Sequence, residues 1–131
     1  MKKRNKAVIA TVVLVITMLI CTACERGSYT IRDGELKHEE NLYKGEYKRF
    51  DGHIEYSLGQ LEKIDLKYSV VTKSGELKIY ILDEQKNVVK SIVEIAGGDG
   101  EIKERFQKEQ KVILKIEGNK HEGSYLLELL Q

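Results

Sequence analysis

The stretch HIEYSLGQLEKIDLKYSVVTKSGELKIYI, residues 53–81, decides the fold of this 131-residue chain. Apolar and polar residues alternate along it with a period of two, first over 54–58, then over 63–70 and again over 76–81. That period places every second side chain on the same face of a β-strand. Each segment is therefore predicted to form a half-buried strand, with one face on a core and the other in water.

The same alternation recurs closer to the C-terminus, over 112–116 and 125–129, with Gly- and Asx-containing turns between the segments. Upstream, Asp51-Gly52 is a dipeptide typical of β-hairpin turns. Seven to nine short strands predict a single small antiparallel β-sandwich, jelly-roll-like, with a β-barrel as the alternative. The side chains predicted to face the core are Ile54, Tyr56, Leu58, Ile64, Leu66, Tyr68, Val70, Leu77, Ile79, Ile81, Val112, Leu114, Ile116, Tyr125, Leu127 and Leu129.

The first 24 residues form a different kind of segment. Residues 1–6 carry four positive charges, and residues 7–20 are apolar except for two threonines. This is the pattern of a secretory signal peptide. At 1.5 Å per residue the apolar run spans roughly 21 Å, less than the ~30 Å hydrocarbon core of a bilayer. An uncleaved signal anchor that extends through Cys24 is the alternative.

The end of this segment, Cys21-Thr22-Ala23-Cys24, resembles the lipobox of bacterial lipoproteins, with Cys21 where that family usually has Leu. The resemblance implies that the Cys24 thiol receives a diacylglycerol thioether, that the signal is then cut between Ala23 and Cys24, and that Cys24 also carries a palmitate. Two acyl chains anchor a protein stably, whereas one does not. We therefore expect a signal peptide over 1–23, the lipidated Cys24 and a tether over 24–35, and the sandwich over 36–131. A redox or zinc Cys-x-x-Cys pair is the alternative, but such a pair belongs on a folded domain.

Composition limits the partners. Four of the 22 basic residues and none of the 21 acidic residues lie in the first 23 positions, so the remainder has 18 basic and 21 acidic residues. A net charge of −3 gives no attraction for nucleic acid, which is therefore not an expected partner. Apart from Cys24, residues 24–131 contain no cysteine, so a hydrophobic core has to supply the stability.

A second resemblance concerns the sandwich itself. The phrase GELKIYILDEQKNVV, a Gly-rich gap and the final GSYLLEL resemble the small β-sandwich of the prepeptidase C-terminal type, which is appended to secreted bacterial proteases. Lys86 replaces the usual turn glycine of that family. The resemblance implies a non-catalytic accessory or binding role. The positions that carry it are Asp83, Asn87, Val88, Gly123 and Tyr125.

No motif predicts catalysis or a cofactor. The chain has no G-x-S-x-G nucleophile elbow, and we assign no catalytic residue. His38, His53 and His121 each lie near a carboxylate but show no metal-ligand spacing, so they are predicted to be exposed surface histidines, with no metal site. Tyr47 and Phe50 are the candidate binding patch for a protein or a glycan, since exposed aromatic residues anchor interfaces. The alternative is that they cap an edge of the sandwich.

Together these features predict an envelope lipoprotein with a non-catalytic β-sandwich, on the extracytoplasmic side of the cell membrane. Its expected role is protein interaction or ligand binding. A carbohydrate- or cell-wall-binding module is the second hypothesis, and a small hydrolase or metal-binding protein is the third. The expected partners are the lipid bilayer, through acylated Cys24, and an envelope protein or glycan.

Overall fold

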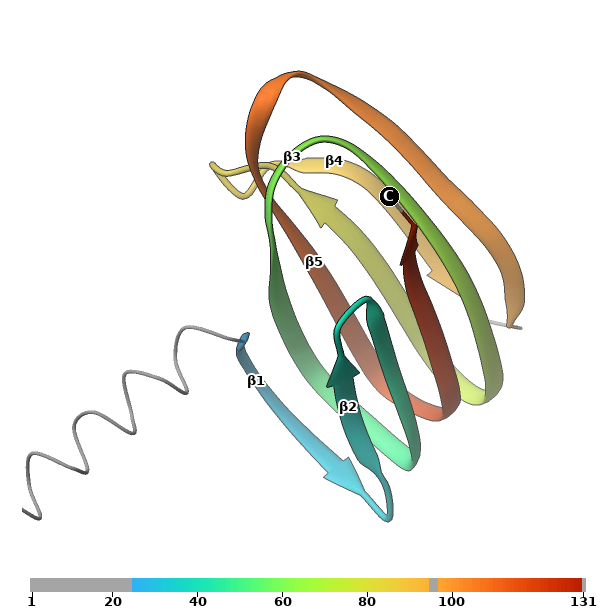
Figure 1. Ribbon diagram of the computed structural model, residues 1–131. Helices are drawn as coiled ribbons and strands as arrows, with labels where there is room; N and C mark the ends of the chain where they lie inside the picture. Colours follow the sequence, from blue (N-terminus) through green and yellow to red (C-terminus); the bar gives the residue numbers. More distant parts are fainter. Residues whose placement is uncertain (1–24, 95–96, 131) are drawn as a thin grey trace, which may run out of the picture.

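A computed structural model describes residues 25–94 and 97–130, in which all regular structure is β (Figure 1). Every pairing is antiparallel. Within those two ranges, no helix has the length and apolar character that a membrane span requires. The strands are β1 (Glu25–Arg32), β2 (Glu35–Glu39), β3 (Leu42–Leu82), β4 (Val88–Glu94) and β5 (Gly98–Leu130).

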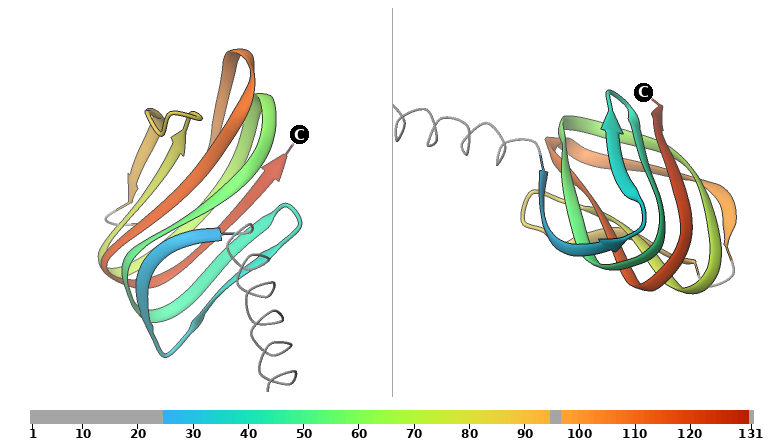
Figure 2. Two further views of the ribbon diagram at one scale, coloured as in Figure 1. Left: turned by 90° about the vertical axis from the view of Figure 1, so that its left-hand side faces the viewer. Right: turned by 90° about the horizontal axis from the view of Figure 1, so that it is seen from below.

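β3 and β5 are long ribbons that bend and pass between two layers (Figure 2). Their pairing register divides them into segments, five to a layer. Layer A contains, in spatial order, 35–39, 42–47, 123–130, 63–72 and 98–105. Layer B contains, in spatial order, 25–32, 49–61, 110–121, 74–82 and 88–94.

The bends occur where the register between β3 and β5 shifts, for example between Tyr47 and Phe50 and between Thr72 and Ser74. Irregularities of this kind bend a strand and increase its twist. The predicted hairpin at Asp51-Gly52 is wrong, because both residues lie inside β3, opposite β1. Gly52 has a φ of 111°, a conformation that favours glycine. Here it occurs inside a continuous strand and not in a hairpin turn.

The core lies between the two layers, and the predicted β-sandwich is confirmed. Of the side chains predicted to face inward, only Leu58 and Tyr68 are half-buried rather than buried, and both pack against the core. In the described ranges β1, β2 and β4 each pair along one side only, with β3. The layers therefore keep open edges, and the barrel alternative does not form.

The sandwich begins earlier than the sequence suggested. β1 pairs with β3 along its whole length, from Glu25 opposite Tyr56 to Arg32 opposite Arg49. The predicted tether over 24–35 is therefore wrong from Glu25 onward. The segment looks like a linker because edge strands are often polar, and in β1 the contacts with the core come from Ile31 and from the Tyr29 ring, whose centroid lies 5.9 Å from that of Phe50. Ala23 and Cys24 lie outside the described residues, so cleavage and lipidation stay predictions.

In the turn between β3 and β4, Lys86 has a backbone conformation that favours glycine. The Asp83 carboxylate accepts hydrogen bonds from the amides of Gln85 at 3.0 Å and Asn87 at 2.8 Å. Lys86 has a φ of 64°, the left-handed conformation that glycine adopts without steric cost. The turn geometry thus agrees with a glycine at this place, while the resemblance to prepeptidase C-terminal sandwiches stays a prediction.

Candidate functional site

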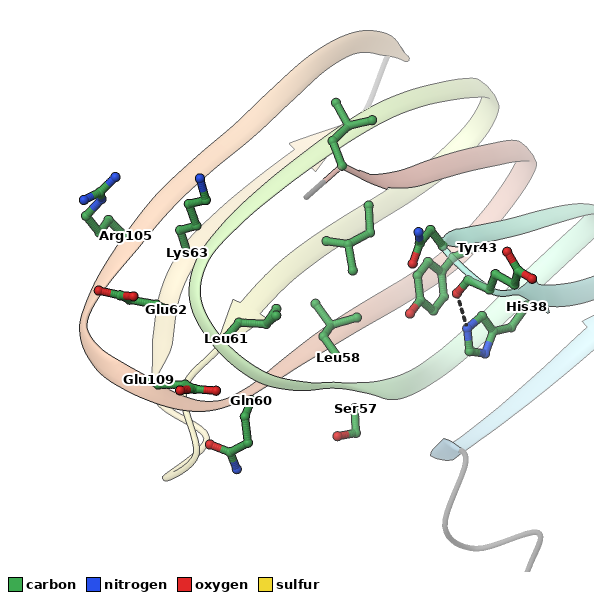
Figure 3. Close-up of a pocket in the computed structure, with 14 residues that line it drawn as sticks. His38, Tyr43, Ser57, Leu58, Gln60, Leu61, Glu62, Lys63, Arg105 and Glu109 are labelled. Atoms are coloured by element: carbon green, nitrogen blue, oxygen red, sulfur yellow. Dashed lines mark hydrogen bonds between the residues drawn. The ribbon is translucent and has the colours of Figure 1, made fainter.

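A cleft of about 680 Å³ opens at one end of the sandwich, where β3, β5 and the β2–β3 turn meet (Figure 3). Its wall follows β3 from Ser57 to Lys63, and β5 and the turn complete the lining. Gly59 has a φ of 87°, and the register with β5 shifts beside it. This conformation lets β3 turn from layer B towards layer A at the wall of the cleft.

The floor of the cleft is apolar. Leu58 and Leu61 are half-buried and pack against the core, and Leu129 is part of the core. The Tyr43 ring also lines the cleft and is almost completely buried. Burial also raises the pKa of the Tyr43 phenol, which therefore stays protonated at neutral pH. The floor is thus an exposed extension of the core and offers aliphatic carbon atoms to a ligand.

His38 occupies one side of the cleft in a fixed orientation. Its ring stacks on Tyr43 with a centroid distance of 4.3 Å and meets the edge of Tyr56 at 5.1 Å. Its Nε2 lies 3.0 Å from the carbonyl oxygen of Glu40. A carbonyl only accepts hydrogen bonds, so Nε2 is the donor of this bond.

Charged and amide side chains complete the lining. Five carry charge, and none of these five forms an ion pair with another described residue. Amides and unpaired charges beside an apolar floor suit a ligand that has both hydrophobic and hydroxyl-bearing faces. These polar side chains are Glu40, Asn41, Gln60, Glu62, Lys63, Arg105 and Glu109.

Three smaller hollows, of about 300, 460 and 300 Å³, lie on the outer face of layer A. Leu126, which is 45% exposed, lines two of them. The third hollow is lined by Lys63 and Arg105, which also line the cleft. These two side chains therefore mark the place where the cleft meets the outer face of layer A.

The predicted aromatic patch is wrong. Tyr47 is 5% exposed and Phe50 is 0% exposed, and their rings stack on each other in the core at 5.3 Å. The register shift between them makes both side chains point inward, although one belongs to layer A and the other to layer B. A ligand cannot reach them without unfolding this part of the sandwich.

The prediction for His121 is also wrong, because this side chain is fully buried. Its Nδ1 lies 2.7 Å from the Tyr47 hydroxyl, and its Nε2 lies 2.8 Å from the Thr72 hydroxyl. Burial lowers the pKa of His121 and raises that of Tyr47, so the ring is neutral and the phenol keeps its proton. The three residues come from three separate bends. Their hydrogen bonds connect these bends in the interior of the sandwich.

The three histidines do not converge on a metal site. His38 lies at the cleft and His121 in the interior, and His53 is half-buried on β3. Over residues 25–94 and 97–130, no three His, Cys, Asp or Glu side chains are grouped so that they can hold a metal ion.

Two features of the sequence mark the bend at the cleft. Gly59 interrupts a strand, and a glycine inside a strand often marks a bend. Leu58 and Leu61 are three residues apart, which breaks the period of two and leaves apolar side chains on both sides of the bend. These signals locate a bend but do not say what lies across from it.

The fold is shared with solved structures at low sequence identity. The chain is similar to TmCBM61, solved in complex with β-1,4-galactotriose, with a TM-score of 0.57 and 10% identity over 82% of this chain and 88% of that chain. A carbohydrate binding module of Cellvibrio mixtus lichenase 5A, in complex with cellotriose, gives a TM-score of 0.46 and 8% identity, over 79% and 89% of the two chains. PirA gives a TM-score of 0.44 and 13% identity, over 81% of this chain and 93% of that chain. By sequence, neither a protein-family model nor a curated protein matches the chain. The comparisons therefore show the fold alone.

Proposed function

We propose that this protein is a non-catalytic, carbohydrate-binding β-sandwich of the bacterial cell envelope. The observation that carries the proposal is the cleft, which combines an apolar floor with unpaired polar side chains. Of the hypotheses drawn from the sequence, the second one, a carbohydrate- or cell-wall-binding module, fits this lining better than a protein-interaction domain. The fold similarity to TmCBM61, whose structure holds a galactotriose, is consistent with it.

In the proposed complex, the aliphatic face of a sugar ring rests on Leu58 and Leu61. The ring hydroxyls hydrogen-bond to side chains around it. The amides of Asn41 and Gln60 both donate and accept, and the carboxylate of Glu62 accepts from hydroxyls. Because Leu58 and Leu61 are already fixed against the core, little side-chain entropy is lost on binding.

We also propose that acylated Cys24 holds the sandwich at the membrane. β1 is paired from Glu25 onward, and Glu25 lies opposite Tyr56, which directly precedes the cleft residues Ser57 and Leu58. Anchored this way, the domain has no free linker, because strand pairing begins at the residue after Cys24, opposite the part of β3 that leads into the cleft. The glycans within its reach are then those near the membrane surface.

The test is a binding measurement on the full-length protein in lipid nanodiscs. Leucine methyl groups are labelled for NMR, and the ligand panel contains β-1,4-galactotriose, cellotriose, chitotriose, trigalacturonate and soluble peptidoglycan fragments. We expect saturable binding of at least one member, with shifts centred on Leu58, Leu61 and Leu129. Saturable shifts centred elsewhere, or no saturable binding by any member, would overturn the proposal.

A matched pair of variants locates the site. Leu61→Ala removes aliphatic surface from the cleft floor and is expected to weaken binding about tenfold, roughly the value of two buried methylene groups. Leu126→Ala makes the same change on the exposed outer face of layer A and is expected to leave the affinity within about twofold. Equal effects of the two substitutions would contradict a site in the cleft.

A further inference from the structure

We propose that the cleft recognises an acidic saccharide, and that Lys63 and Arg105 together bind the carboxylate of a uronic acid unit. This inference rests on the proposed carbohydrate binding and adds the class of sugar. The two cations lie at the edge of the cleft, where it meets the neighbouring hollow on the outer face of layer A.

The pairing register places the two positive charges directly across from each other. Lys63 of β3 is the cross-strand partner of Arg105 of β5, so both side chains leave the same face of layer A. Figure 3 shows them at one end of the cleft, with His38 and Tyr43 at the other. Like charges in directly opposed positions repel and destabilise a sheet. An anion that binds between them removes this repulsion.

Neither cation is neutralised within the described part of the chain. On the same face, Lys103 lies 4.0 Å from Asp65 and 3.5 Å from Glu101, and Lys37 lies 3.1 Å from Glu35. Lys63 and Arg105 have no such carboxylate, although the layer carries acidic residues nearby. Lys44 and Lys67 of the same layer also form no ion pair with another described residue, and Lys44 lies opposite Lys37, which is paired with Glu35. What distinguishes Lys63 and Arg105 is that both lack a carboxylate partner, oppose each other directly and line the cleft.

The geometry of the pair suits a carboxylate. Adjacent strands are about 4.8 Å apart, so both cationic groups can reach one small anion. A guanidinium binds a carboxylate through two parallel hydrogen bonds, and an ammonium adds a third donor without a fixed direction. The three carboxylates of the cleft, Glu40, Glu62 and Glu109, remain available for the neutral hydroxyls of the same ligand.

The experiment compares an acidic sugar with its neutral ester. Trigalacturonate and its methyl ester are titrated into the full-length protein in nanodiscs of neutral lipid, at a constant ionic strength of about 0.15 M because salt screens exposed charges. We expect the acid to bind at least about tenfold more tightly than the ester, a difference of about 1.4 kcal/mol. In the double variant Lys63→Gln, Arg105→Gln we expect both ligands to bind equally.

Lys44→Gln is the matched control, because it removes one exposed cation from layer A at a position away from the cleft. We expect it to keep the preference for the acid. Thermal unfolding supplies a second readout: the double variant should be as stable as wild type or more stable, since it removes like-charge repulsion. A clear loss of stability would mean that the pair has a structural role and would overturn the inference.

The outcomes separate this inference from the proposed function. Equal binding of acid and ester by the wild-type protein would overturn the inference and leave carbohydrate binding intact. If the double variant still prefers the acid to the ester, the inference is also overturned and carbohydrate binding again stays intact. Full displacement of the acid by equimolar inorganic phosphate would show an anion site without sugar recognition, which also overturns it. Failure of every saccharide to bind would instead overturn the proposed function.

Discussion

The hydrogen-bonded chain Tyr47–His121–Thr72 gives a prediction that follows directly from its geometry. Tyr47→Phe removes one hydroxyl and keeps the aromatic ring, so the stacking on Phe50 at 5.3 Å is preserved. What is lost is the hydrogen bond of 2.7 Å to His121 Nδ1. Because His121 is fully buried, no bulk water replaces that partner.

The magnitude follows from the burial of the group that stays behind. A buried polar atom that loses its only partner costs about 1–3 kcal/mol of stability. A loss of about 2 kcal/mol lowers the Tm of a domain of this size by roughly 8–16 °C. Tyr80→Phe is the matched control, since Tyr80 is half-buried on β3 and its ring stays available to Lys115. We expect that change to stay within about 0.5 kcal/mol.

The same chain makes the stability depend on pH. Burial lowers the pKa of His121 in the folded state, so the unfolded chain, with a histidine pKa of about 6.5, takes up the proton first. The contribution of His121 to stability is therefore fully present above about pH 6.5 and is lost as the pH falls towards the folded-state pKa. One proton changes the free energy of unfolding by at most about 1.4 kcal/mol per pH unit.

Urea denaturation, followed by tyrosine fluorescence and circular dichroism between about pH 5 and pH 7.5, measures both effects. His121→Gln keeps a donor and an acceptor in the cavity but removes the titration. We expect it to show a smaller pH slope than wild type below pH 6.5. The reasoning is refuted if Tyr47→Phe costs no more than Tyr80→Phe, or if His121→Gln leaves the pH slope unchanged.

Three further predictions concern other parts of the chain. Gly118→Ala should lower the free energy of unfolding by about 1–3 kcal/mol in urea titrations, because the added methyl group overlaps the buried Phe50 ring; a change below about 0.5 kcal/mol would contradict this packing. Asp51→Asn should lower the Tm at pH 7, and the Tm difference from wild type should narrow below about pH 4. Hydrogen bonds to the Asp51 carboxylate depress its pKa, so its contribution to stability disappears on protonation. A Tm difference that does not change with pH would contradict a contribution from the ionised carboxylate. Cys24→Ala should abolish metabolic labelling with lipid and accumulate the precursor, whereas Cys21→Ala should leave labelling intact, and labelling of the Cys24 variant would rule out that anchor.

The strands and their inward faces could be read from the sequence because the signal is local. Leu66, Ile79 and Leu114 are fully buried, as the alternation predicts. Successive side chains of a strand point to opposite faces of the sheet, so a period of two is seen whatever the arrangement of the layers. The β-sandwich follows, since many strands with one apolar face each have to cover one another.

The burial of side chains at the bends was not predicted from the sequence. Tyr47, Phe50 and His121 lie in polar surroundings in the sequence, and we expected exposed side chains at each of them. In the structure a register shift reverses the alternation there, so all three point inward. The position of such a shift depends on how β3 and β5 pair, which is a property of two distant segments.

The sequence by itself thus determined the all-β class, most of the core and the candidate lipidation of Cys24, because each depends on residues that are neighbours in the chain. Only the tertiary structure decided where a ligand can bind. The cleft forms where Leu58 and Leu61 of β3 come close to Arg105 and Leu129 of β5. The Lys63–Arg105 pair exists only in the folded register, because strand pairing brings together charges that the sequence keeps far apart.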